Sequence, residues 1–126
     1  MSFPPSLFRA LVEFAPDTFL VVNTAGTIVF ANAQSERLFG YEREELVGSS
    51  VEMLVPIPLR DRHTSYRGEY GANPHARPMG IGLSLHARRK DGSELPVEIS
   101  LSPVRTDDET YVVATVRDVT ERRRIE

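Results

Sequence analysis

Apolar residues recur at helical spacing in the first segment of the chain. Within residues 3–14, Leu7, Leu11 and Phe14 lie three or four positions apart, so their side chains share one face of a helix. This spacing predicts a short N-terminal amphipathic helix. Pro16 follows closely, and a proline at this place predicts that the helix has ended.

Two short runs rich in β-forming residues come next. They occupy residues 19–22 and 27–30, with turn residues between them, and together they predict a β-hairpin. Asn32 follows directly, and its side-chain oxygen suits the N-cap of a helix. Gly40 suits the end of that helix because glycine tolerates a positive φ. Residues 41–55 have a helical pattern of apolar positions that is broken in places, which predicts short helical segments.

The middle of the chain contains a second apolar helical face. Leu59, His63, Tyr66 and Tyr70 have the spacing i, i+4, i+7, i+11, which predicts a helix of nearly three turns. Residues 71–78 are rich in glycine, asparagine and proline and predict a loop.

The last third of the chain alternates apolar and polar positions. Residues 81–87 and 95–101 each predict a strand with one face on the core, and Asp91-Gly92 between them predicts a hairpin turn in which both positions can adopt positive φ. Residues 110–117 are apolar on both faces, which favours a central strand. The fold class is therefore α+β, with an antiparallel sheet and short helices over one face.

The length fits one domain, and the composition excludes several classes of site and partner. The chain has 126 residues, a formal net charge of −3 and no cysteine. The absence of cysteine excludes disulfides, thiolate metal sites and flavin–cysteinyl photochemistry. The mild acidity argues against nucleic acid as a partner. No apolar run is long enough to span a membrane and no secretory signal is recognisable, so we expect a cytoplasmic domain without membrane contact.

No arrangement of residues predicts an enzyme. Gly80-Ile81-Gly82 lacks the third glycine and the helix of a phosphate-binding loop. Residues 107–109 are acidic but lie on a predicted tight turn, where a solvated turn is the better interpretation. The basic run 122–124 is best interpreted as a solvated helix face or the flank of a coiled coil.

The three histidines have different interpretations. His63 lies on the apolar face of its predicted helix, so it is either a partly buried, hydrogen-bonded side chain or an axial ligand to a haem iron. His75 is either an exposed loop residue or a contact for a cofactor carboxylate. We expect His86 to face solvent, opposite Leu85.

A series of motifs in order along the chain resembles the PAS sensor domain family, including its C-terminal part, often called PAC. The resemblance covers about residues 8–126, and it is carried by residues 15–22, 28–33, 38–41, 44–48, 88–93, 96–102 and 117–122.

This resemblance implies a PAS fold with a five-stranded antiparallel sheet, short helices over one face and a pocket between them. It implies a sensory and regulatory module that binds a small ligand, forms a homodimer, or does both. The expected organisation is a capping or dimerisation helix at 1–14, the PAS domain at 15–120 and a signalling helix beginning at 121–126. Arg117, Asp118 and Thr120 would relay the signal to a C-terminal output domain of the same chain.

Part of the chain also resembles oxygen-sensing haem PAS domains of the FixL type. In that group the residue matching His63 is the proximal haem ligand, and the one matching His75 lies near a propionate. The arginine that binds oxygen is replaced here by Leu83, and the arginine that pairs with a propionate by Glu69. Three alternatives are therefore open for the pocket: it binds haem, it binds another small ligand, or it binds no ligand. In the third case the chain would be a protein-interaction domain. The expected pocket residues are His63, Tyr66, Tyr70, His75 and Leu83.

Overall fold

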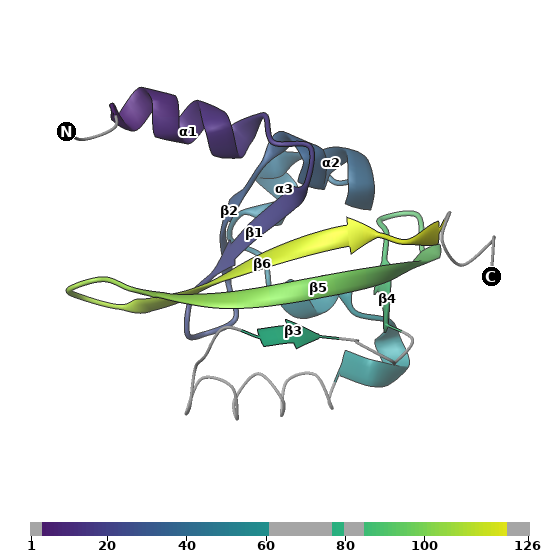
Figure 1. Ribbon diagram of the computed structural model, residues 1–126. Helices are drawn as coiled ribbons and strands as arrows, with labels where there is room; N and C mark the ends of the chain where they lie inside the picture. The colour runs from purple at the N-terminus through teal and green to yellow at the C-terminus, as the bar shows by residue number, and fades with distance from the viewer. Residues whose placement is uncertain (1–3, 61–76, 80–84, 121–126) are drawn as a thin grey trace.

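A computed structural model describes residues 4–60, 77–79 and 85–120. Helices and strands follow one another in the order expected for an α+β domain (Figure 1). Their bounds are α1 Pro5–Glu13, β1 Thr18–Val22, β2 Ile28–Ala31, α2 Ala33–Phe39, α3 Arg43–Leu46, the 3₁₀ turns η1 Val51–Leu54 and η2 Ile57–Leu59, β3 Arg77–Met79, β4 Leu85–Arg88, β5 Glu94–Arg105 and β6 Thr110–Asp118.

The strands form one antiparallel sheet in the order β2-β1-β6-β5-β3. The short strand β4 also pairs with β5. Because β3 pairs with residues 99–101 of β5 and β4 with residues 94–97, the two lie one after the other along the same edge. The sheet is thus five strands wide, as predicted, and β6 is central, as its two apolar faces indicated.

Two details differ from the sequence prediction. Arg77 and Pro78 belong to β3, so the predicted loop was wrong there. Pro78 is tolerated because, among the described strands, β3 lies at the edge of the sheet and pairs with β5 alone. In the Asp91-Gly92 turn only Gly92 has positive φ, 89°, and Arg89 N–H donates to Ser93 O, which is the pattern of a longer loop with one left-handed residue.

The predicted helical face from Leu59 to Tyr70 lies mostly outside the described residues, and only its first residue is seen, at the end of η2. The predicted strand 81–87 is described from Leu85 onward and runs to Arg88. His86 on this strand is exposed, as expected.

The core fills one face of the sheet, under α2, α3 and η1. Alternate residues of β1 are buried, and the same alternation begins β5, as the period of two demands. Their partners in register are buried on the same side, for example Leu20 opposite Ala114 and Ile28 opposite Val22. Phe39 and Leu46 from the two helices close this layer and are almost fully buried.

Asn32 joins three elements at the edge of this core. It is fully buried. Its Nδ2 donates to Val12 O at 3.0 Å and to Asp17 O at 2.9 Å, while its Oδ1 accepts from Phe19 N at 3.1 Å and from Ser35 N at 3.2 Å. The last bond is the predicted N-cap of α2. One amide therefore fixes the end of α1, the start of β1 and the start of α2.

Replacing Asn32 should cost far more stability than an ordinary cap. For Asn32→Ala we expect a loss of about 3 kcal/mol or more in the free energy of unfolding, because a cap contributes ~1 kcal/mol and each buried group left unpaired costs ~1–3 kcal/mol. Urea unfolding followed by circular dichroism measures it. Asn23→Ala is the control, since Asn23 also accepts two backbone bonds but is only half-buried. Equal losses for the two variants would contradict the role given to Asn32.

Candidate functional site

The structure describes the predicted relay residues but not the predicted pocket residues. His63, Tyr66, Tyr70, His75 and Leu83 all lie outside the described residues. Arg117, Asp118 and Thr120 are described, and they lie at the point where β6 ends.

The end of β6 is closed by a short turn. Asp118 Oδ1 accepts from Thr120 N at 2.9 Å and from Thr120 Oγ1 at 2.6 Å. Between them, Val119 is buried and its N–H donates to Pro96 O of β5 at 3.1 Å. The backbone leaving the sheet is thereby fixed to the neighbouring strand as well as to itself. Arg117 is exposed on the opposite face, across from Glu98 in register.

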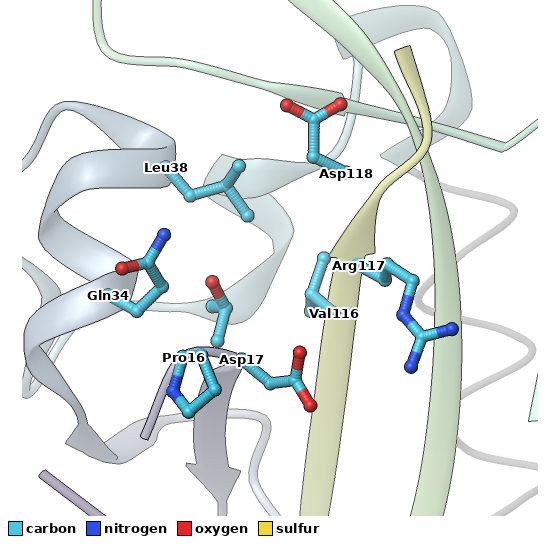
Figure 2. A pocket seen from close by; sticks show the side chains of 8 residues that line it. Pro16, Asp17, Gln34, Leu38, Val116, Arg117 and Asp118 are labelled. Carbon is cyan, nitrogen blue, oxygen red and sulfur yellow. The ribbon is translucent and has the colours of Figure 1, made fainter. Parts of the chain in front are cut away.

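A groove of about 230 Å³ lies beside this turn (Figure 2). Its walls come from the segment leading into β1, from α2 and from the end of β6. The lining residues are Pro16, Asp17, Thr18, Gln34, Leu38, Val116, Arg117 and Asp118. Its volume falls below the ~300–1,000 Å³ of typical small-molecule sites, so it suits a single side chain better than a cofactor.

Two of the lining residues, Arg117 and Asp118, are ones that the sequence analysis named as relay residues, whereas it did not name Asp17, Thr18 or Gln34. Those three stand far from Asp118 along the chain, and no local pattern connects them with it. The signal that could have found them is the sheet pairing. Thr18 lies directly opposite Val116, so the start of β1 must lie beside the end of β6.

A second, apolar surface lies further along the inner face of the sheet. Leu85 of β4 and Ile99 and Leu101 of β5 are only partly buried and pack against the core, as do Val51 and Met53 of η1. We call these five residues the apolar wall. Partly buried apolar side chains suit contact with a porphyrin or another hydrophobic ligand, so the chemistry of the wall fits haem.

The hairpin that carries the wall is tied to the helices by a charged pair. Lys90 Nζ lies 2.7 Å from Glu45 Oε2 of α3, and Lys90 N–H donates to Phe39 O at 2.9 Å. The hydrogen bond from Lys90 lowers the pKa of Glu45, and the same bond raises the pKa of Lys90. Both side chains are exposed, so this pair positions the hairpin and adds little to stability.

The described ranges 4–60, 77–79 and 85–120 contain no group of three or more side chains placed to hold a metal ion. Within the same ranges, no helix has the length and apolar character needed to cross a membrane.

Comparisons with known proteins agree with the fold. A family model described as "PAS domain" matches residues 16–121. The sensor protein FixL of Bradyrhizobium diazoefficiens is 34% identical over 113 residues, covering 90% of this chain and 22% of that protein. The oxygen sensor protein DosP of Escherichia coli is 34% identical over 99 residues, covering 79% of this chain and 12% of that protein.

A solved PAS domain from Colwellia psychrerythraea superposes with a TM-score of 0.79 at 22% identity, covering 92% of this chain and 97% of that one, which supports the fold. The chain spans less than a quarter of the length of the two curated relatives described above.

Proposed function

The chain belongs to the PAS domain family, and from this premise we propose that its sensory signal leaves through the turn at Asp118 and Thr120. A PAS domain is a sensory module rather than a catalytic centre. The observation that carries the proposal is the fixed exit of β6. Because Val119 is bonded to β5 and Asp118 to Thr120, a distortion of the sheet changes the direction of the backbone after Thr120.

The path from the apolar wall to this turn is short. Ile99 of the wall lies directly opposite Val116 of β6, which is two residues before Asp118. A ligand that moves Ile99 therefore acts on the strand that leads into the exit. We also propose that the signal controls an output domain that follows Thr120, and that the protein is located in the cytoplasm.

We propose further that two copies associate through α1. Leu7, Leu11 and Phe14 are 44%, 56% and 78% exposed, although they line one face of the segment that α1 forms. An apolar stripe of this kind on a small domain marks a contact surface. Figure 1 shows α1 projecting away from the sheet, with its C-terminal end near the other helices.

Haem is the second candidate, favoured by the apolar wall and by the similarity to FixL and DosP. When bound, its iron supplies a site for a diatomic gas. His63 would be the axial ligand, as the resemblance implies, and the wall would exclude water. With Leu83 at the position of the family's arginine, no donor is available there to hydrogen-bond a bound oxygen.

The relay predicts that a perturbation of the wall reaches the chain beyond Thr120. Ile99→Val should shift the amide signals of residues 119–126 in a nitrogen-15 NMR spectrum. The same change made together with Asp118→Ala should shift them much less, since the turn is then open. Asp107→Ala, a carboxylate removed from the exposed β5–β6 turn, is the matched control. Equal shifts in the presence and absence of Asp118 would refute the relay.

The association through α1 predicts a dimer in sedimentation analysis. Leu11→Glu with Phe14→Glu should raise the dissociation constant tenfold or more, roughly the effect of losing one well-packed apolar contact. Because both side chains are exposed, the free energy of unfolding should hardly change. Arg9→Glu places the same charge on the opposite face of α1 and should leave the dimer intact. A chain that stays monomeric at millimolar concentration would contradict the proposal.

The haem candidate predicts a Soret band when the protein is produced with a haem precursor. His63→Ala should abolish that band, because the iron loses its axial imidazole. His86→Ala is the control, since His86 is exposed on β4, and it should retain the band. Absorbance from protein alone, or a band that survives His63→Ala, would reject His63 as the ligand.

A further inference from the structure

The last turn of α1 is joined to the rest of the domain by two polar contacts. Asn32 Nδ2 donates to Val12 O at 3.0 Å. Arg43 Nη2 of α3 donates to Glu13 Oε1 and forms an ion pair with it. The other end of α1 projects away from the sheet, and Leu7 there is exposed (Figure 1). The direction of α1 is therefore set at its C-terminal end.

The ion pair between Glu13 and Arg43 is partly shielded from water. The side chain of Glu13 is only 16% exposed, and that of Arg43 is 40% exposed. A pair withdrawn from solvent is screened less than a surface pair, so this one holds its partners more firmly than the exposed pair of Lys90 and Glu45. We call the pair of Glu13 and Arg43 the clasp.

Arg43 is held in place by the start of α3. Its backbone N–H donates to Glu36 Oε2 of α2 at 2.9 Å. Glu42, the residue before it, is the N-cap of α3 and shares a capping box with Glu45. Arg43 is thus the single basic residue of a short helix that is otherwise acidic. Without its charge, the carboxylate of Glu13 would face acidic neighbours, and like charges repel.

The same short helix also holds the β4–β5 hairpin. Glu45 Oε2 accepts from Lys90 Nζ of the hairpin at 2.7 Å, and Glu45 Oε1 accepts from Glu42 N–H at 2.9 Å. Glu45 stands two residues after Arg43, so the two share one turn of helix. The two carboxylate oxygens of a single glutamate therefore join the hairpin to the turn that positions Arg43.

The clasp has one unused donor. Arg43 Nε is buried and has no hydrogen-bond partner among the residues that the structure describes. A guanidinium can form two parallel bonds with one carboxylate, and a buried N–H left unpaired is unfavourable. A small shift of α3 against α1 that offers Nε a carboxylate oxygen would thus be stabilised. The clasp can therefore exist with one bond or with two, and a contact with two arrangements is one that a small shift can switch.

We propose that α3 connects the β4–β5 hairpin to α1, through the residues Lys90, Glu45, Arg43 and Glu13. The hairpin moves with the apolar wall, because Leu85 of the wall belongs to β4. A movement of the hairpin displaces Glu45 and the start of α3, and the clasp then changes the direction of α1. This route from the wall leads to the N-terminal helix and avoids β6 and its exit turn.

The connection has a consequence for the association of two copies. The apolar stripe proposed as the contact surface lies on α1, so the direction of α1 decides how the two copies are arranged. This consequence rests on the association proposed above, whereas the connection itself is a property of one copy. A distance measured within one copy therefore tests the connection whether or not the chain forms a dimer.

The direction of α1 can be measured with a pair of spin labels. The chain contains no cysteine, so labels attach only where cysteines are introduced. Ser6→Cys in α1 and Thr24→Cys in the β1–β2 turn replace exposed residues outside the clasp. Doubly labelled chains diluted in an excess of unlabelled protein report the distance within one copy by pulsed electron paramagnetic resonance. The otherwise native chain should give a narrow distribution of distances.

Removing either side of the clasp should free α1. Glu13→Gln and Arg43→Gln should each widen the distribution by about twofold or more, because the last turn of α1 loses one of its two polar contacts. The double variant should be no wider than either single variant, since the two residues act as one pair. Arg37→Gln removes the same charge from an exposed position on α2 and should leave the width unchanged. An unchanged width in both clasp variants would overturn the proposal.

Lys90→Gln tests the connection from the hairpin to the clasp. It should widen the distribution in the labelled native chain and have no further effect in a chain that already carries Arg43→Gln, because the route is then broken. Arg105→Gln is the control, since it removes a charge from the exposed far end of β5. The connection is refuted by a native chain that does not respond to Lys90→Gln, or by a response of equal size with and without Arg43.

Discussion

The arrangement of the domain depends on the buried amide of Asn32. An asparagine side chain has two donor hydrogens and an oxygen with two lone pairs, and all four are used on backbone groups of α1, the β1 entry, β1 and α2. No other side chain type carries this combination at this length. Because one of the four partners is Asp17 O, the same amide also sets where the rim of the groove lies.

The second constraint is the pairing of β1 with β6. Thr18 lies opposite Val116, so the entry and the exit of the sheet meet at one end of the molecule. Val116 in turn lies opposite Ile99 of the apolar wall and lines the groove. A single buried valine, Val116, therefore lies between β5, which carries part of the wall, and β1, and it also lines the groove beside the exit turn.

Local sequence patterns predicted the elements but could not predict the groove. The cap at Asn32, the positive φ of Gly40 and the central position of β6 follow from residue type and periodicity, and the structure confirms them. Pro78 misled the prediction because proline suits both loops and edge strands, and only pairing decides between them. Thr18 carries no local signal for the groove, since the groove forms only where the start of β1 meets α2 and the end of β6, which lie far away along the chain.

The groove and the apolar wall divide the chemistry of the domain. The groove is small and lined by two carboxylates, those of Asp17 and Asp118, so it does not suit a large apolar cofactor, whereas the wall has no charged residue to orient a cation. Ile99 belongs to the wall and Val116 lines the groove, and the two residues lie opposite each other across the ladder between β5 and β6. In the relay proposed above, a change in the packing of the wall reaches the groove through this pair. The antiparallel ladder between β5 and β6 makes this possible, because its backbone hydrogen bonds hold the two facing residues together.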